Sequence, residues 1–355
     1  MKFIHISDVH LGFVPDAGKP WCENRTQERW TTFQKVIELC NYRQVDLLLI
    51  SGDLFSRQPL KRELKEVNYL FSTLKYTRVV LIAGDSDHLK SGTGYSDYHW
   101  CSQVVFFDSD DFLSAYFPDC NTEVCGFSYV SDEMPDAGLE EITPGDSDRI
   151  QVLIAHGGDE KHAPFNMKIL SEAGFNYVAL GHLHQPDIRK EWNMAYAGAL
   201  EPIDSRDIGP HGCIFGEIED GMTELSFIPM SIREYIPLQI QLTPELSQTD
   251  IENQVAEEIE RHGKNHIYSI FIDGIYDPDF KLDDASLKRL GNVLEVTMRA
   301  IPEYDLEHLC QIHKSDVIGK FIKAYLDKEQ PLSDQKRKAL YLGIQTLLQN
   351  TEYYK

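Results

Sequence analysis

The chain has 355 residues, 42% of them hydrophobic, which leaves room for one large domain and one or two small ones and is ordinary for a globular protein. Its net charge of −23 repels nucleic acid, so the overall balance favours no DNA-binding surface and fits either solubility or carboxylates gathered at a metal site. Seven cysteines without a CxxC pair, and no apolar run near the roughly 18 residues of a membrane span, lead us to expect a cytoplasmic protein with reduced thiols and no structural zinc.

The first two-thirds of the chain alternates short apolar runs with amphipathic segments. The runs at 2–8, 45–53 and 79–85 are typical of strands, and the last two are rich in Val, Leu and Ile, as in strands buried on both faces. Between them, residues 26–44 and 60–76 carry apolar side chains at helical spacing. This alternation predicts parallel strands joined by helices.

After about residue 100 the strands follow one another with fewer helices between them. The apolar runs lie at 103–108, 123–130, 150–158, 177–184, 194–200, 212–219 and 223–231. They predict a second sheet packed on the first, with helices outside.

Near Ser231 the pattern changes to a compact β-α-β-α-β unit, and from Leu306 onward it is helical with a break at Pro331. We therefore expect an α/β protein. Its parts are a two-sheet α/β sandwich over 1–232, a small α+β domain over 233–302 and a C-terminal helical segment over 303–355.

Five of the apolar runs end in side chains that bind metals. In chain order these are Asp8, His10, Asp53, Asp85, His156, His182 and His184. A single D-x-H, G-D or H-x-H is more often a turn or a satisfied core group. Because α/β folds place their sites beyond the carboxyl ends of parallel strands, five such endings together indicate one metal site.

The residue types fit two divalent cations about 3.5–4 Å apart, which need a bridging carboxylate and further oxygen or nitrogen ligands. Mixed histidine and carboxylate ligation suits Mn²⁺, Fe²⁺ or Zn²⁺ better than Mg²⁺ or Ca²⁺. With both ions present, a bridging hydroxide forms near neutral pH and attacks phosphorus in line with the leaving group. The pattern thus indicates hydrolysis of a phosphate ester.

With this order of motifs the chain resembles the calcineurin-like metallophosphoesterases. The segments "MKFIHISDVHLG", "GDLFSRQP", "GHLHQP", "YAGALEP" and "GPHGCIFGEIE" are similar to the SbcD/YhaO family of DNA-repair exonucleases over residues 1 to about 230. The resemblance implies a DNA-cleaving hydrolase that forms a homodimer. It also implies that 233–302 is a capping domain and that 303–355 docks on an SbcC-like coiled-coil ATPase.

The resemblance further implies how the ligands are divided. Asp53 would bridge two ions, which we expect to be Mn²⁺, with Fe²⁺ or Zn²⁺ as alternatives. The first ion would be held by Asp8, His10 and His184, and the second by His156, His182 and position 85. The other histidines, His162 among them, are expected at the surface or in packing.

The family motif Gly-Asn-His-Asp reads Gly-Asp-Ser-Asp at 84–87. Asp85 replaces an amide and can still ligate, but its charge brings the sum over two dications, Asp8, Asp53, Asp85 and a hydroxide to zero, which weakens attraction for a phosphodiester. Ser86 replaces a histidine that assists the departing alkoxide, and loss of a general acid costs about 10²–10⁴ in rate. His88 could supply a substitute imidazole or be an ordinary loop residue.

These departures leave more than one function open. The first is a Mn²⁺-dependent exonuclease subunit acting on DNA with reduced activity. The second is a catalytically weak, metal-binding subunit that works through its ATPase partner, and a third is a phosphoesterase for another substrate. The aromatic loop 88–100 could stack bases or be an edge of the fold.

Overall fold

The computed structural model describes residues 1–146, 148–326 and 333–352; Pro331, where a helix break was expected, lies outside them. The chain divides into two compact units, Met1–Tyr235 and Ile236–Lys355. In the described part of the chain, no helix is long and apolar enough to cross a membrane.

The first unit contains two six-stranded sheets. The first sheet has the order β12-β11-β1-β2-β3-β4, in which β1 to β4 are parallel and β11 is antiparallel to β1. Its strands are β1 (Lys2–Ile6), β2 (Leu47–Ser51), β3 (Arg78–Ile82), β4 (Val104–Phe106), β11 (Gly212–Glu219) and β12 (Met222–Pro229).

The second sheet has the order β5-β6-β7-β8-β10-β9, with β6, β7, β8 and β10 parallel. Its strands are β5 (Leu113–Phe117), β6 (Thr122–Gly126), β7 (Ile150–His156), β8 (Tyr177–Gly181), β9 (Asp187–Arg189) and β10 (Met194–Tyr196). The strands β5 and β9 were not among the predicted runs. Both lie at sheet edges, where partial exposure removes the continuous apolar pattern.

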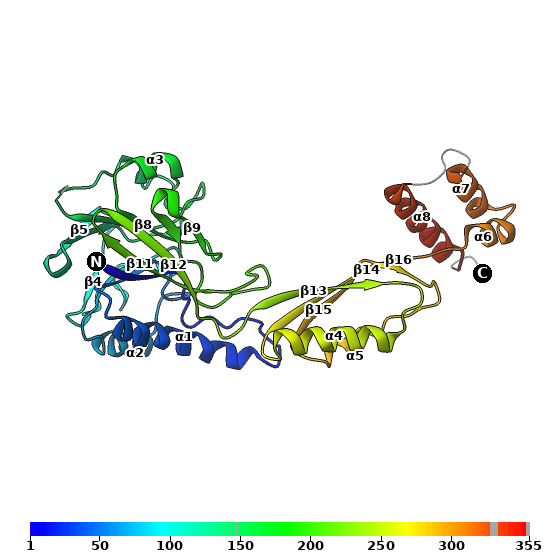
Figure 1. Ribbon diagram of the computed structural model, residues 1–355, viewed down its shortest axis with the longest axis horizontal. Helices are drawn as coiled ribbons and strands as arrows, with labels where there is room; N and C mark the ends of the chain where they lie inside the picture. The colour runs from blue at the N-terminus through cyan, green and yellow to red at the C-terminus, as the bar shows by residue number, and fades with distance from the viewer. Residues whose placement is uncertain (147, 327–332, 353–355) are drawn as a thin grey trace. The chain divides into compact units, whose positions relative to one another are not determined.

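Side chains that alternate along the strands build the core between the sheets. Phe3 and Leu49 of the first sheet lie in one apolar cluster with Ile154 and Ala179 of the second. The opposite faces of the first-sheet strands pack on α1 (Cys22–Arg43) and α2 (Lys61–Ser72). The short helix α3 (Met167–Glu172) packs on the outer face of the second sheet, as Figure 1 shows.

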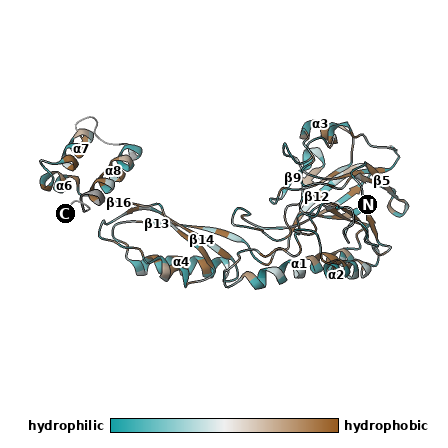
Figure 2. Cartoon of the chain, turned by 180° about the vertical axis from the view of Figure 1, so that it is seen from behind, coloured by the Kyte–Doolittle hydropathy of each residue, from teal (hydrophilic) through white to brown (hydrophobic). Residues whose placement is uncertain are grey.

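The second unit has its own sheet and its own apolar clusters. The sheet contains β13 (Tyr235–Leu242), β14 (Ile267–Tyr276), β15 (Val293–Met298) and β16 (Ile301–Pro302), and α4 (Gln248–His262) and α5 (Asp284–Lys288) cover it. Figure 2 shows hydrophobic residues along the strands and hydrophilic residues on the outer turns of α4. The helices α6 (Leu306–Ile312), α7 (Val317–Leu326) and α8 (Asp334–Glu352) form a further cluster around Ile318, Ile322 and Ile344.

Two packed sheets, a third sheet and flanking helices confirm the predicted fold class. The finer division at residues 232 and 302, with a capping domain and a docking segment, stays a prediction.

Candidate metal centre

The two sheets bring the seven predicted ligands to one edge of the sandwich. Three strands of the first sheet and two of the second end there; β7 ends in His156, and at least one of these side chains follows each of the other four strands. The ligand atoms of Asp8, His10 and His184 lie within 4.8 Å of one another, and so do those of Asp85, His156 and His182. A metal in each group would therefore draw ligands from both sheets.

Asp53 lies between the two groups. Its Oδ2 is 3.5 Å from His10 Nε2, and its Oδ1 is 3.7 Å from His156 Nε2. One carboxylate with an oxygen toward each group has the arrangement that a bridging ligand requires.

Several ligand residues adopt backbone conformations that hydrophobic periodicity cannot reveal. Asp8, His10 and Asp53 have φ values of 49°, 48° and 52°, and His182 has a φ of 96°. Such left-handed residues are uncommon outside glycine and gather at functional sites. The turns aim the side chains at one another immediately after the strands end.

Glycines next to the ligands allow the strand ends to approach closely. A Cβ on Gly84 would lie 2.2 Å from Asp53 Oδ1, and one on Gly52 would lie 2.3 Å from His156 Nδ1. At Gly181, a Cβ would lie 2.0 Å from the Ser51 carbonyl oxygen. Any side chain at these positions would push the ligand residues apart.

The protonation of the site fits cation binding. His10 Nε2 is buried and has no hydrogen-bond partner among the described residues. Burial, followed by the nearby His184 and Arg29, holds the pKa of His10 well below its ordinary value. A neutral imidazole nitrogen beside the Asp8 and Asp53 carboxylates is a metal donor set.

In the second group, acidic and basic side chains lie side by side and shift the pKa values of one another. Burial opposes ionisation of Asp85, but hydrogen bonds from His156 and His182 hold its pKa below the ordinary value. Burial also opposes protonation of His156, yet Asp53 and Asp85 raise its pKa to about 10. Burial raises the pKa of Asp53, and the charges of Asp85, Asp87 and Asp8 raise it further. Binding of a divalent ion at these side chains would therefore release protons from the histidines and from Asp53.

Ser86 and His88 have different surroundings. The Ser86 hydroxyl donates to Asp53 Oδ2 at 2.7 Å, and its backbone N–H donates to Asp53 Oδ1 at 3.0 Å. The Nδ1 of His88 lies 2.7 Å from the Asp85 carbonyl oxygen, and His88 belongs to neither ligand group among the described residues. In the aromatic loop, Tyr95 is fully buried against Phe55, so it belongs to the edge of the fold.

Four supporting residues were missed by the sequence analysis. Arg29 donates to the Val9 carbonyl oxygen at 3.1 Å and so braces the D-x-H turn. Asp87 accepts from the N–H groups of Gly84 and Phe55 at 2.8 and 3.0 Å, which locks the loop that carries Asp85. Asp159 and Asp207 face His182 and His184. Only Asp87 lies within a motif, so only it carried a sequence signal.

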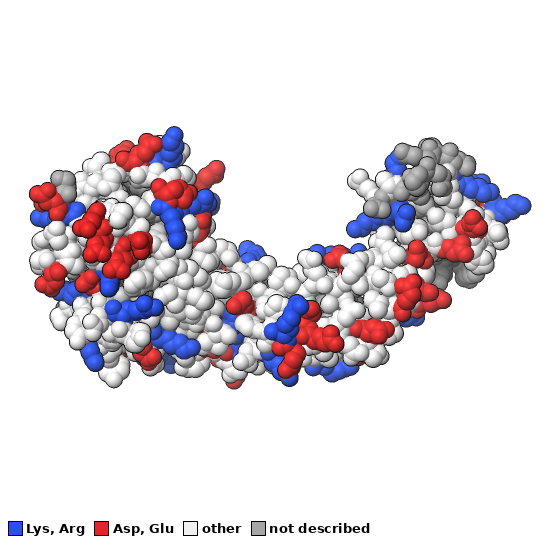
Figure 3. Space-filling view, in the orientation of Figure 1, with Lys and Arg blue, Asp and Glu red and all other residues white. Residues whose placement is uncertain are grey.

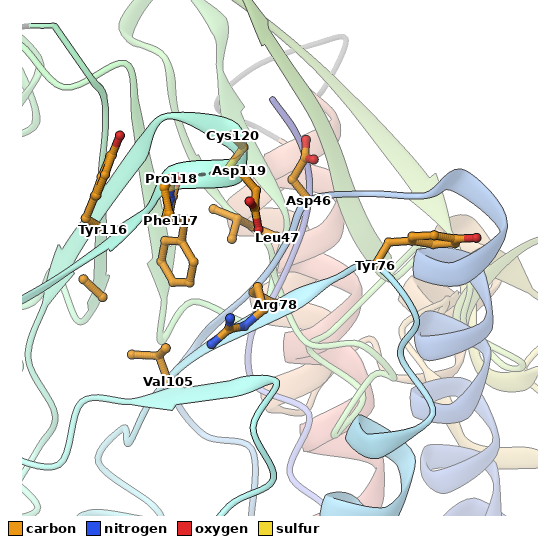
Figure 4. Close-up of a pocket in the computed structure, with 11 residues that line it drawn as sticks. Asp46, Leu47, Tyr76, Arg78, Val105, Tyr116, Phe117, Pro118, Asp119 and Cys120 are labelled. Carbon is orange, nitrogen blue, oxygen red and sulfur yellow. Dashed lines mark hydrogen bonds between the residues drawn. The ribbon is translucent and has the colours of Figure 1, made fainter.

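A separate cavity of about 120 Å³ opens at the amino ends of β2 and β3, the edge opposite the ligands. Its lining includes Asp46, Arg78 and Phe117, and Figure 4 shows the last two pointing toward one another. It contains none of the predicted site residues.

Comparison with known proteins gives a consistent result. The model of the calcineurin-like phosphoesterase family matches residues 1–186. The DNA double-strand break repair protein Mre11 of Archaeoglobus fulgidus is 25% identical over 329 residues, covering 84% of this chain and 72% of that protein. Its counterpart in Sulfolobus acidocaldarius is 22% identical over 346 residues, covering 90% and 84%. The uncharacterized metallophosphoesterase YhaO of Bacillus subtilis is 23% identical over 247 residues, covering 64% and 60%.

Proposed function

The chain belongs to the calcineurin-like phosphoesterases, which are metal-dependent enzymes with two divalent ions, and from this premise we propose that it is a phosphodiesterase of the DNA double-strand-break repair type. In this role it would be the exonuclease subunit of a repair complex. The observation that carries the proposal is the position of Asp53, with one oxygen toward each of two three-residue ligand groups.

In this proposal Asp8, His10 and His184 hold one ion, Asp85, His156 and His182 hold the other, and Asp53 serves both. We propose Mn²⁺ as the working ion because imidazole and carboxylate ligands are mixed in each group. The ions supply a nucleophile ionised near neutral pH and neutralise charge on the phosphoryl oxygens.

The chain's own residues set how well this chemistry runs on DNA. The Ser86 hydroxyl holds Asp53 in place but cannot protonate a departing alkoxide near pH 7. Asp85 adds a negative charge to the side of the second ion, which reduces the pull on a phosphodiester. We therefore propose slow cleavage of DNA, with the weakness in the departure of the leaving group.

DNA as substrate is supported by the names of the Mre11 relatives. The protein's own surface attracts DNA little. The net charge of the protein is −23, and Figure 3 shows acidic and basic side chains interspersed on the described face. In the proposed complex a partner supplies the basic surface.

That partner is proposed to be an SbcC-like coiled-coil ATPase, docked through residues 303–355. Ile318 and Ile322 are buried against α8, so they are occupied within the chain. Ile312 and Val317 are 61% and 57% exposed, so their side chains can contact a partner. The variant Ile312→Asp/Val317→Asp should lose the ATPase in a pull-down, and unchanged binding would remove this part of the proposal.

We also propose that the chain forms a homodimer. Sedimentation at the monomer mass of 40.7 kDa would refute it.

A second candidate is a catalytically weak, metal-binding subunit, and the hydrogen bond that ties Ser86 to Asp53 favours it. Degradation of end-labelled double-stranded DNA with Mn²⁺ separates the two candidates, with His184→Ala as the blank. Degradation well above the blank supports the exonuclease. Degradation equal to the blank supports the weak subunit.

A further inference from the structure

Each histidine of the segment "GHLH" faces a carboxylate that belongs to neither proposed metal group. His182 Nδ1 lies 3.2 Å from Asp85 Oδ1, inside the second group, whereas its Nε2 lies 2.8 Å from Asp159 Oδ2. His184 Nδ1 lies 3.3 Å from Asp207 Oδ2. The two carboxylates come from different loops, one after β7 and one after β10.

Asp159 is held in place although its side chain is 51% exposed. Its Oδ1 accepts from the backbone N–H of Lys161 at 2.9 Å and lies 2.8 Å from His162 Nδ1. The turn is closed by the bond from Gly158 N–H to the His162 carbonyl oxygen at 2.7 Å. The His162 ring lies 4.4 Å from the His182 ring, so this histidine, expected at the surface or in packing, packs on a residue of the site.

Asp207 is held more tightly, since its side chain is 7% exposed. Its Oδ2, the oxygen that faces His184, also accepts from the backbone N–H of Ile203 at 2.8 Å. Its own N–H donates to the Asp204 carbonyl oxygen at 3.0 Å. If Asp207 were substituted, water could take over its contact with His184 less readily than it could take over the contact of the exposed Asp159 with His182.

These contacts decide which nitrogen each histidine offers to a metal. An ionised carboxylate only accepts hydrogen bonds, so a ring nitrogen that faces Asp159 or Asp207 carries the hydrogen. With an ion in the second group, Asp85 would be a ligand and not an acceptor, and the nitrogens toward it would keep their lone pairs for the metal. His182 then offers Nδ1, and His184 offers Nε2. His156 follows the same rule with a backbone partner, because its Nδ1 faces the Ser51 carbonyl oxygen at 2.8 Å and leaves Nε2 toward Asp85.

We propose that Asp159 and Asp207 are positioning residues, each of which fixes the ring of one histidine and thereby sets the affinity of one metal ion independently of the other. Asp159 acts through His182 on the second ion, and Asp207 acts through His184 on the first. The inference rests on the ligand assignment of the proposed function.

Asp159, His162 and His182 could instead hold a third ion, because their ligand atoms lie within 4.8 Å of one another. His182 would then ligate through both nitrogens and lose both ring hydrogens. A neutral imidazole beside a hydrogen-bonded carboxylate avoids that cost, which favours the positioning role. The number of bound ions distinguishes the two arrangements.

The test is a titration of metal-free full-length protein with Mn²⁺, in which electron paramagnetic resonance counts the unbound ion. In the His184→Ala background, Asp159→Ala should weaken the remaining ion about tenfold, and Asp207→Ala should leave it unchanged. In the His182→Ala background, Asp207→Ala should weaken the remaining ion up to about a hundredfold, and Asp159→Ala should have no effect.

Asp159→Asn keeps an oxygen that accepts from His182, so it should restore most of the affinity that Asp159→Ala loses. This rescue separates positioning from a general loss of structure, and unfolding of the metal-free variants checks the fold. If Asp159→Ala weakened Mn²⁺ equally after His182 had been removed, the proposal would be overturned. Three bound ions that fall to two in His162→Ala would also overturn it. No substrate is used, so failure to degrade DNA does not bear on this result.

Discussion

The hydroxyl of Ser86 donates a 2.7 Å hydrogen bond to Asp53, the carboxylate that lies between the two proposed metal groups. A histidine stands at this position in the family motif and assists the leaving group. Here the side chain holds a carboxylate that we propose as a ligand. In the proposed site, metal binding and departure of the leaving group would therefore be separable.

Ser86→His should raise the rate of DNA cleavage by about 10²–10⁴, because it restores a general acid for a strongly basic leaving group. The rate on bis(p-nitrophenyl) phosphate should hardly change, since p-nitrophenolate departs without a proton. The measurement compares kcat on both substrates with Mn²⁺. Ser86→Ala, which removes the bond from the hydroxyl to Asp53 and keeps the one from the backbone N–H, is the matched control. An equal rise on both substrates would contradict the missing-acid account.

Mn²⁺ should stabilise the first unit. The buried carboxylates Asp8 and Asp53 lie together there, and cations relieve their repulsion. Binding at a hundred times the dissociation constant adds about 2.7 kcal/mol per ion, which raises the melting temperature by roughly 5–10 °C.

All four tryptophans lie in residues 1–235, so tryptophan fluorescence during heating, with and without EDTA, measures this unit alone. His184→Ala should lose a large part of the shift. A melting temperature insensitive to both Mn²⁺ and EDTA would argue against a metal centre.

Gly84→Ala should weaken both ions together. Its Cβ would lie 2.2 Å from Asp53 Oδ1 and 2.8 Å from the Asp53 backbone nitrogen, so the bridging carboxylate must move. Mn²⁺ titration measures the effect. Gly94→Ala is the matched control, because within the described structure a Cβ there meets Leu64 alone, at 3.9 Å. Normal binding of both ions in Gly84→Ala would show that Asp53 does not need its present position.

His5 should make the first unit lose stability in mild acid. It is buried between the Tyr177 and Ser51 hydroxyls at 2.8 Å each, and burial lowers its pKa to about 3. Below pH 6.5 the unfolded chain binds a proton that the folded chain does not, so stability is full above that pH and falls as the pH drops toward 3. The loss between pH 6.5 and pH 5 is about 2 kcal/mol.

Denaturant unfolding of His5→Gln, followed by tryptophan fluorescence between pH 5 and pH 7, checks this expectation. The variant should be less stable at pH 7 but show a flatter pH dependence. His99→Gln, at an exposed histidine of the same unit, is the matched control. A pH dependence identical to that of the parent protein would rule out a neutral, buried His5.

The sequence was informative wherever an apolar run ended in a ligand type. The runs that became β1, β2, β3, β7 and β8 predicted both the strands and the edge where Asp8 and His156 meet. That success has a physical cause, because buried parallel strands need continuous apolar residues and their carboxyl ends meet at one edge.

The supporting residues and the turns of the site depend on loop geometry, which hydrophobic periodicity does not reveal. Asp159 and Asp207 lie 23 residues before His182 and 23 residues after His184 in chain number, outside any motif, and only loop closure brings them to the rings. The left-handed turns at Asp8 and Asp53 are likewise invisible in the pattern. Hydrophobic spacing fixes strands, whereas single hydrogen bonds and turns fix the supporting residues.

Hydrolysis of bis(p-nitrophenyl) phosphate shows whether these residues form a working two-metal centre, because this substrate needs no general acid. The rate is measured with Mn²⁺ for the parent protein and for Asp53→Asn, with bound ions counted in both. We expect two bound ions and clear turnover in the parent protein, and loss of both turnover and at least one ion in the variant. Two bound ions with turnover no higher than that of Asp53→Asn would contradict it.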